Sequence, residues 1–313
     1  MNMFPAATPA QAQALLSLPA ARLFEQAGRL REAVFGRRVD LCAIINARSG
    51  NCAMDCRFCS QSRHNHTPIA VFDLLPDETL RERILELAAL PVNHIGIVTS
   101  GAALSEAELA RLRAVLAALP DNVRPRVCAS LGRLNSAQLE QLAQAGLTRY
   151  HHNLETAQGH YPRVCTTQTW EQRRDTVAHA MRVGLTACTG GLFGLGESWE
   201  ERIAFAFSLK ALGVRNVPMN FLHPHPETPL AGQQPLSADE ALRIIALFRH
   251  ILPEATLRIC GGRPTTLGAR QHEIFAAGAN ALMTGDYLTT HGQGLEEDLA
   301  MIAAQGLEAG GDA

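Results

Sequence analysis

The feature that most constrains the fold is a series of eight short apolar segments, each typical of a β-strand, which alternate with helix-like stretches. The segments cover residues 39–45, 94–98, 126–130, 148–154, 185–189, 216–221, 256–260 and 281–284. Strands that alternate with helices favour a parallel sheet, because a parallel neighbour is reached only through a long crossover. Eight such units in roughly 250 residues predict a (β/α)8 barrel of the TIM type. An open doubly wound sheet is the alternative.

Capping signals support the helices between these segments. A polar residue stands three positions before Glu or Gln at Ser105, Asn135 and Ser237, which is the pattern of a helix N-terminus. Gly146 and Gly184 stand where two of the helices should end.

The sequence also predicts how the chain is divided. Residues 1–38 are expected to form an N-terminal helical extension, and residues 39–305 the barrel. The last residues, 306–313, are glycine-rich and polar, and we expect them to be a disordered tail.

Composition narrows the class of protein. The 313 residues are 47% hydrophobic and 19% charged, as in an ordinary globular protein. A net charge of −2 argues against nucleic acid or an anionic membrane as a partner. No stretch reaches about 18 uninterrupted apolar residues, and the first residues lack the pattern of a signal peptide. We therefore expect a cytoplasmic protein, in which the eight cysteines are thiols or metal ligands rather than disulfides.

Three cysteines follow the first strand in a C-x3-C-x2-C spacing. Cys52, Cys56 and Cys59 offer three thiolates and no obvious fourth ligand, whereas a structural zinc site closes with four protein ligands. An iron–sulfur cluster held by three thiolates would keep one iron open to a small molecule. The alternative is a zinc loop completed by His64 or His66, but zinc ligands usually come as two matched pairs.

Four further cysteines fall on alternate strands of the predicted barrel. Cys42, Cys128, Cys188 and Cys260 lie on the first, third, fifth and seventh strands. Because each interior layer of such a barrel takes its side chains from alternate strands, these four could meet in one layer and hold a second cluster. The alternative is that they are ordinary core thiols. Cys165 lies in an irregular segment and is interpreted as structural.

Polar residues follow several strands, at the end of the barrel where catalytic groups of this fold lie. Asn153 and Glu155 share one face after the fourth strand, and the carboxylate could bind ribose hydroxyls. The glycine-rich run after the fifth strand, which includes Gly191, allows close approach of the backbone to a ligand. Arg173 could bind a ligand carboxylate, and Asn220 could pair with a urea-like group. Each of these residues has an ordinary surface or loop role as its alternative.

Taken together, these motifs resemble the biotin synthases, a branch of the radical S-adenosylmethionine (SAM) enzymes. Phe58, just before the third cysteine, is the aromatic that this superfamily usually carries there. The more specific resemblance extends from about residue 38 to 290. It is carried by residues 46–50, 61–62, 131–132, 145–147, 150–156, 190–197, 218–220, 228–230 and 258–263.

The resemblance implies a homodimeric (β/α)8 barrel that inserts sulfur between C6 and C9 of dethiobiotin. The C-x3-C-x2-C cysteines would hold a [4Fe–4S] cluster, reduced by a small electron-transfer protein, and SAM would yield a radical that abstracts hydrogen from dethiobiotin. Sulfur would come from an auxiliary iron–sulfur cluster. The residues implied to contact SAM are Phe58, Asn153, Glu155, Arg173 and Gly191, and those implied to contact the ureido ring are Asn153 and Asn220.

The chain departs from the usual family pattern at the auxiliary cluster. The familiar [2Fe–2S] cluster takes three cysteines and an arginine, and this chain matches the arginine with Arg258 but has Thr99 at one cysteine position. Two other cysteines stand where serine is usual. Our hypothesis is a rearranged auxiliary cluster, of [2Fe–2S] or four-iron type, with Arg258 as a candidate further ligand. Its predicted cysteine ligands are Cys42, Cys128, Cys188 and Cys260.

Two other functions fit parts of the pattern. Another radical SAM enzyme of the same branch, such as a hydrogenase-cofactor maturase, would share the barrel and the first three cysteines. The pair Asn153 and Asn220, with the barrel-core cysteines, argues against it. A non-catalytic iron–sulfur carrier would need only the two clusters, and the residues implied to contact SAM argue against that function.

Overall fold

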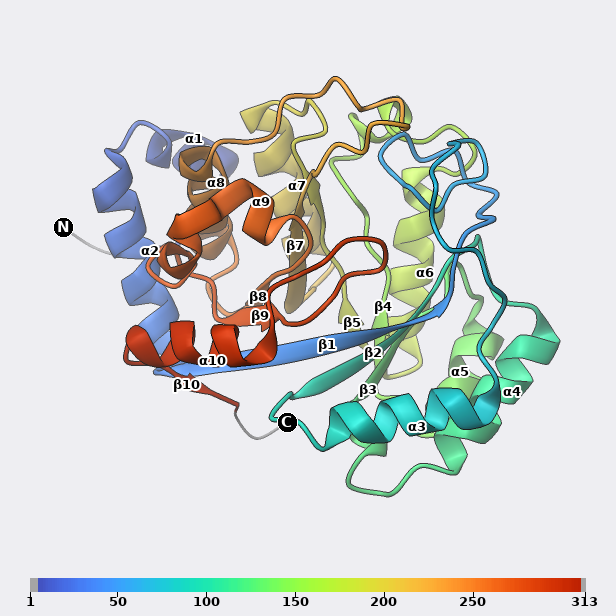
Figure 1. The fold of residues 1–313 in the computed structure, drawn as a ribbon. Coiled ribbons are helices and arrows are strands. Elements are labelled where there is room, and N and C mark those ends of the chain that lie inside the picture. The colour runs from blue at the N-terminus through green and yellow to red at the C-terminus, as the bar shows by residue number, and fades with distance from the viewer. Residues whose placement is uncertain (1–4, 311–313) are drawn as a thin grey trace.

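Eight parallel strands close into a barrel in the computed structural model, which describes residues 5–310 (Figure 1). Hydrogen bonds join β1 to β2 on one side and to β9 on the other, so the ring is closed. The prediction of a (β/α)8 barrel is confirmed, and the open sheet is excluded. The barrel strands are β1 (Arg38–Arg48), β2 (His94–Thr99), β3 (Val127–Ser130), β4 (Arg149–His151), β5 (Thr186–Cys188), β7 (Asn216–Phe221), β8 (Thr256–Ile259) and β9 (Ala281–Met283).

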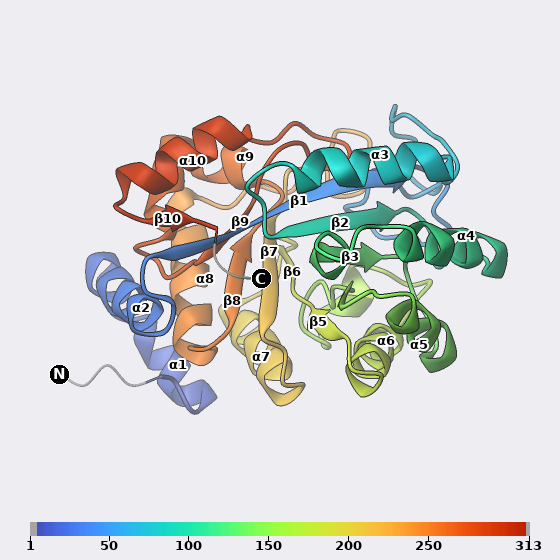
Figure 2. The same cartoon turned by 90° about the horizontal axis from the view of Figure 1, so that it is seen from below.

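Helices surround the barrel on its outside (Figure 2). They are α3 (Asp77–Ala88), α4 (Glu106–Ala117), α5 (Ser136–Gln144), α6 (Trp170–Arg182), α7 (Trp199–Ala211), α8 (Ala238–Ile251), α9 (Arg263–Leu267) and α10 (Leu295–Ala304). Short 3-10 helices cover Arg124–Arg126, Tyr161–Arg163 and Gly268–Ile274. Apolar residues from these helices pack against the outer faces of the strands and form a continuous core.

The helix boundaries follow the capping signals in the sequence. Ser105 and Asn135 each form a capping box, and the Ser237 hydroxyl caps α8. Gly146 and Gly184 follow α5 and α6 with φ values of 99° and 85°, a region in which glycine has no steric penalty.

One strand within the barrel was not predicted. The short β6 (Gly191–Phe193) pairs with β7, as β5 does further back along the chain. The fifth position of the barrel is therefore filled by two short strands, joined by the glycine-rich run. This interruption turns the backbone toward the interior at the end of the barrel where the strands finish.

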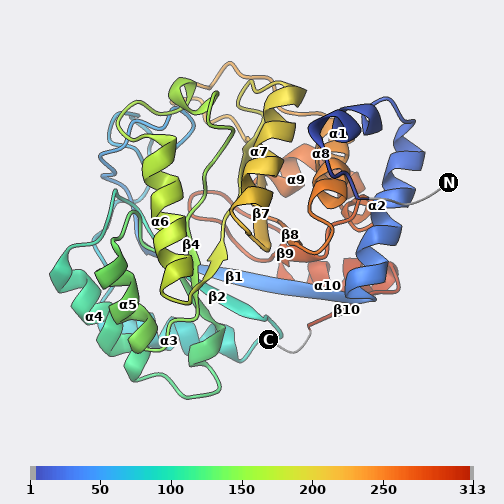
Figure 3. The same cartoon turned by 180° about the vertical axis from the view of Figure 1, so that it is seen from behind.

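The N-terminal extension is helical where the structure describes it. It consists of α1 (Pro9–Leu15) and α2 (Ala20–Phe35), which lie beside α7 and α8 on the outside of the barrel (Figure 3). The N–H of Ala6 donates to the carbonyl of His250 at 2.8 Å, which fixes the start of the extension to α8. Residues 1–4 lie outside the described residues.

The prediction of a disordered tail is wrong for its first part. β10 (Glu308–Ala309) pairs with β1 at Arg38 and Val39, and Arg37 lies 3.4 Å from Glu308 in an ion pair. The physical reason is that β1 extends beyond the ring at its N-terminal end and offers unpaired backbone groups there. Residues 311–313 lie outside the described residues.

A helix that crosses a membrane must be both long and apolar. From residue 5 to residue 310, no helix has both the length and the apolar sequence that crossing a bilayer takes.

A buried ion pair fixes the last helix to the barrel. Arg263 on α9 lies 2.8 Å from Asp298 on α10, and both side chains are 0% exposed. Gln293 also donates to Asp298 at 2.9 Å. Removing one partner of such a pair leaves the other charge buried without compensation.

We therefore expect Asp298→Ala to lower the free energy of unfolding by about 3–5 kcal/mol, because Arg263 would stay buried and unpaired. Urea unfolding followed by circular dichroism would measure it. The matched control is Glu254→Ala, which breaks an exposed pair with Arg215 and should cost less than about 1 kcal/mol. Equal small losses in the two variants would contradict the prediction.

Candidate functional site

Both groups of cysteines predicted from the sequence line one cavity of about 430 Å³. The cavity opens at the C-terminal end of the barrel strands, where the loop after β1 covers it. None of these cysteines is in a disulfide. The cysteines that line the cavity are Cys42, Cys52, Cys56, Cys59, Cys128, Cys188 and Cys260.

Two polar side chains hold the loop that carries the C-x3-C-x2-C cysteines. The side-chain oxygen of Gln61 accepts from Ser49 and from the backbone of Gly50, where the loop begins. The side-chain amide of Asn65 donates to the carbonyls of Cys56 and Cys59, at 3.2 and 2.9 Å. The positions of these cysteines are therefore fixed by the loop's own hydrogen bonds.

The chemistry of this loop fits an iron–sulfur cluster better than zinc. Burial raises the pKa of Cys59 to about 11, so a thiolate there needs a positive partner. His64 lies 3.1 Å from the carbonyl of Ala53, and His66 is exposed. Across residues 5–310, no three His, Cys, Asp or Glu side chains come close enough to hold a single ion. A cluster of several irons spaces its thiolates more widely than one zinc ion does.

The four core cysteines meet inside the barrel. Each is 1–6% exposed, and the charge of Cys188 acts on the pKa of each of the other three. Burial raises the pKa of Cys42 to about 11. On β2, a Cβ at Gly96 would lie 3.5 Å from the sulfur of Cys128, so this glycine leaves space beside that thiol. Four buried thiols with free volume between them suit a cluster better than a packed core.

A buried arginine lies against one of these thiols. The guanidinium of Arg258 is 3.9 Å from the sulfur of Cys188 and 2.7 Å from Asp40. Asp40 also lies 3.2 Å from His94. Although burial favours the neutral acid, Arg258 and His94 hold the pKa of Asp40 well below its usual range. Arg258 is therefore already engaged by a carboxylate.

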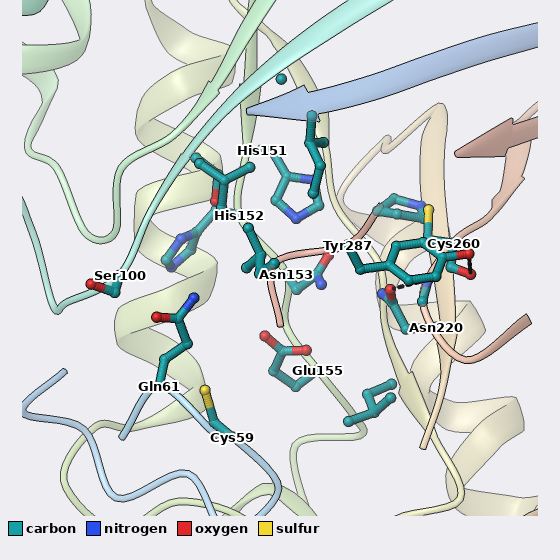
Figure 4. A pocket seen from close by; sticks show the side chains of 18 of the residues that line it. Cys59, Gln61, Ser100, His151, His152, Asn153, Glu155, Asn220, Cys260 and Tyr287 are labelled. Carbon is teal, nitrogen blue, oxygen red and sulfur yellow. Dashed lines mark hydrogen bonds between the residues drawn. The ribbon is translucent and has the colours of Figure 1, made fainter. Parts of the chain in front are cut away.

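Three of the residues predicted to contact SAM, Asn153, Glu155 and Arg173, line the cavity between the two groups of cysteines. Arg173 pairs with Glu155 at 2.8 Å and donates to the carbonyl of Asn153. Both charged side chains are largely buried, and burial raises the pKa of Glu155 despite the nearby cation. Figure 4 shows Asn153 and Glu155 between Cys59 on one side and Cys260 on the other.

Gly191 permits a close approach between β6 and the segment that follows β4. A Cβ at this position would lie 2.2 Å from the carbonyl oxygen of Glu155, so only glycine fits. Asn220 on β7 donates to the carbonyl of Gly191 at 3.1 Å and accepts from the N–H of Gly261 at 3.0 Å. The Asn220 amide is thus held in one orientation at the cavity wall, as Figure 4 shows. Phe58 also lines the cavity.

Several cavity residues were not found from the sequence. His94, which pairs with Cys42 in the sheet, lines the cavity, and Asp40 contacts His94 from two residues before Cys42; this alternation is a signal that could have found both. His151 lines the cavity beside Cys188 in the sheet, and burial with nearby arginines lowers the pKa of His151 to about 4. Tyr287, whose hydroxyl donates to the carbonyl of Cys260, belongs to a loop and left no sequence signal.

Asp55 fastens the cluster loop to a second loop. Its carboxylate accepts from the backbone N–H groups of Thr166 and Thr167 at 2.9 and 3.1 Å, from both hydroxyls, and from the thiol of Cys165 at 3.2 Å. These bonds, acting against burial, hold the pKa of Asp55 well below its usual range. The N–H of Arg57 in the cluster loop also donates to the carbonyl of Val164 at 3.0 Å, so the second loop lies directly against the cluster loop.

Comparison with known proteins identifies two matching family models. Residues 47–209 match the Radical SAM superfamily, and residues 218–308 match the Biotin and Thiamin Synthesis associated domain. A biotin synthase of Desulfovibrio desulfuricans is 68% identical over 98% of this chain and 97% of the relative. A biotin synthase of Nitratidesulfovibrio vulgaris is 45% identical over 96% of this chain and 86% of the relative.

Solved structures show the same fold at low sequence identity. A methylornithine synthase superposes with a TM-score of 0.84 at 20% identity, covering 97% of this chain and 94% of its own. The FeFe-hydrogenase maturase HydG from Carboxydothermus hydrogenoformans has a TM-score of 0.82 at 20% identity, covering 96% of this chain and 75% of its own. These likenesses establish the barrel and carry no statement about the substrate.

We expect Asp55→Ala to loosen the cluster loop, because two backbone N–H groups would lose their acceptor, at a cost of about 1–3 kcal/mol. Hydrogen exchange of residues 164–167 and urea unfolding would measure it. Since the folded pKa of Asp55 is lowered, its contribution should be complete above about pH 4 and be lost as the pH falls further.

The control is Asp121→Ala, which removes an exposed carboxylate in an ion pair with Arg124. It should leave exchange in residues 164–167 unchanged. A variant at Asp55 with wild-type exchange and the wild-type acid dependence of stability would contradict the role of this carboxylate.

Proposed function

The chain belongs to the biotin synthase family of the radical SAM superfamily, and on this premise we propose that its cavity inserts sulfur into dethiobiotin to form biotin. The observation that carries the proposal is one cavity lined both by the C-x3-C-x2-C cysteines and by four cysteines of the barrel core. The hydrogenase maturase shares the fold at 20% identity, whereas a biotin synthase reaches 68%. The maturase and carrier alternatives are therefore not retained.

Cys52, Cys56 and Cys59 would hold a [4Fe–4S] cluster, which in its reduced form supplies the electron that cleaves SAM. The loop's fixed backbone supports this assignment, since the Asn65 amide donates to the carbonyls of Cys56 and Cys59. The protein's part is to hold the reacting groups close together and to keep water away from them.

SAM would be bound by the wall between the two groups of cysteines. Glu155 is suited to the ribose hydroxyls, because it is a buried carboxylate oriented by Arg173. Asn153 and the backbone at Gly191 would contact the rest of the molecule, and Phe58 would contact it from the cluster loop. The support for this set is that all these residues other than Gly191 line the same cavity, and that Gly191 bonds the cavity residue Asn220.

Dethiobiotin would be recognised by side-chain amides rather than by charges. Its ureido ring is uncharged and has both donors and acceptors, which Asn153 and Asn220 can match. The lowered pKa of His151 keeps this imidazole neutral at pH 7, so it adds no charge beside the ring. Tyr287 and the segment after it would limit the access of water, since Asn46 donates to the carbonyl of Leu288 at 3.0 Å.

The auxiliary cluster, which would supply the sulfur, is proposed to be held by Cys42, Cys128, Cys188 and Cys260. Thr99 lines the cavity but has a hydroxyl where the usual family pattern has a cysteine. We assign Arg258 a different part from ligation, because Asp40 already holds its guanidinium. Arg258 would donate to the thiolate of Cys188 and balance its charge. The homodimer, the protein reductant and the cytoplasmic location stay predictions.

The function is tested by anaerobic turnover of the reconstituted protein with SAM, dithionite and dethiobiotin. We expect mass spectrometry to detect biotin, with one 5′-deoxyadenosine for each of the two C–H bonds broken. Cys52→Ala should abolish both products, because the cluster would lose a ligand. Deoxyadenosine without biotin from the wild-type protein would contradict the substrate.

The auxiliary ligands are tested by Cys42→Ser and Cys260→Ser. We expect each variant to lose auxiliary iron and sulfide and to make no biotin, while still cleaving SAM at the first cluster. Iron and sulfide analysis with Mössbauer spectroscopy would measure the loss. Thr99→Ala is the control, and it should keep the full iron content. Full auxiliary iron and sulfide in either cysteine variant would overturn this ligand set.

A further inference from the structure

A second hollow lies on the outer side of the cluster loop. Its volume is about 350 Å³, and Arg57, His160, Arg163, Leu230 and Gln233 are among its lining residues. It is separate from the cavity described above: Phe58, the neighbour of Arg57, lines the cavity, whereas Arg57 lines the hollow. The cluster loop therefore has one side in each space.

The wall between the two spaces is thin. Phe58 packs from the cavity side against a small apolar cluster that includes Val164 and Leu195, and both of these residues also line the hollow. The N–H of Arg57 donates to the carbonyl of Val164 at 3.0 Å, so the wall is also fixed by the backbone. An electron that enters at the hollow would have only this loop to cross before it reaches the cluster-binding cysteines.

The hollow is positively charged. Arg57 and Arg163 are exposed, and within residues 5–310 neither makes an ion pair with a carboxylate. No acidic residue is among the described residues that line the hollow. The carboxylate of Glu201, behind it, already accepts from His160 at 3.2 Å and from the N–H of Ser198 at 2.7 Å. The Arg57 guanidinium donates to the carbonyl of Arg163 at 3.3 Å. Against burial, which raises the pKa of Glu201, Arg163 helps to lower it, but neither exposed guanidinium is in a salt bridge in the described part of the chain.

We propose that this hollow, with Arg57 and Arg163 at its rim, is the docking surface for an acidic electron-transfer protein. The proposal rests on the proposed function, because the cleavage of SAM takes one electron that must come from outside the chain. Acidic carboxylates on the carrier would pair with the two arginines and orient its redox group toward the thin wall. Such an interface is expected to be small, steered by charge and weakened by salt.

The test compares two reductants on the same variants. Dithionite reaches the cluster without docking, whereas a reduced acidic flavodoxin must dock. We expect Arg163→Glu to raise the KM for flavodoxin in 5′-deoxyadenosine formation by about tenfold at about 50 mM salt, and to flatten its salt dependence. Arg57→Glu should act in the same direction. With dithionite, Arg163→Glu should form 5′-deoxyadenosine at the wild-type rate.

Two control variants distinguish a loss of docking from a disturbance of the cluster loop. Arg163→Lys keeps the charge and should keep most of the wild-type KM for flavodoxin. Arg215→Glu reverses a 77% exposed charge at the opposite end of the barrel and should change neither assay. An unchanged KM for flavodoxin in Arg163→Glu would overturn the proposal, as would an equal loss with dithionite, which would mean that the arginine only supports the loop.

Failure of the proposed function would look different from failure of the docking surface. If the wild-type protein forms no 5′-deoxyadenosine with dithionite, the proposed function is contradicted, and the docking surface with it. The wild-type protein could instead be active with dithionite, while its rate with flavodoxin changes neither with salt nor with substitution of Arg57 or Arg163. That result would contradict only the docking surface.

Discussion

The site depends on one strand, β1, which fixes both groups of cysteines relative to each other. It pairs with β10 at its start, with β9 and β2 around the ring, and it ends where the cluster loop begins. Cys42 lies within this strand and Cys52 shortly after it. Because a strand is stiff and is held on both sides here, the distance from the barrel core to the cluster loop is set by backbone geometry. The C-terminal ends of the other strands and the loops after them supply the rest of the cavity wall.

Burying several thiolates in one place is unfavourable unless positive charge accompanies them. The pKa values of the core cysteines are raised by desolvation, so the protein alone would keep them as neutral thiols. The chain itself provides cations in Arg149 and Arg258, and Asp40 prevents Arg258 from being an unpaired charge in the barrel. The interior is thus arranged for an inserted group that carries positive charge, and an iron–sulfur cluster is such a group.

The sequence predicted what depends on periodicity and spacing. Strand runs of alternating or continuous apolar residues located all eight barrel strands, and the alternation of strands placed four cysteines in the same interior. It did not predict several other features, of which three show why. The strand predicted over residues 148–154 is β4 (Arg149–His151), because the backbone then turns into the cavity. The pairing of Asp40 with Arg258 needs the barrel to bring β1 and β8 together. The tail was predicted to be disordered because of its glycines, whereas its backbone pairs with the unpaired start of β1 and forms a short strand.

Glu155 adopts a φ of 67°, a left-handed conformation that costs a non-glycine residue about 1–2 kcal/mol. The residue is kept there by the bridge to Gly191 and the ion pair with Arg173. Glycine at position 155 would relieve the conformational penalty and would remove the carboxylate. It would also leave Arg173 buried without a carboxylate partner, which costs about 3–5 kcal/mol and exceeds the strain relieved. A library of variants screened for thermal stability alone should therefore retain the carboxylate at position 155, in spite of its strained backbone.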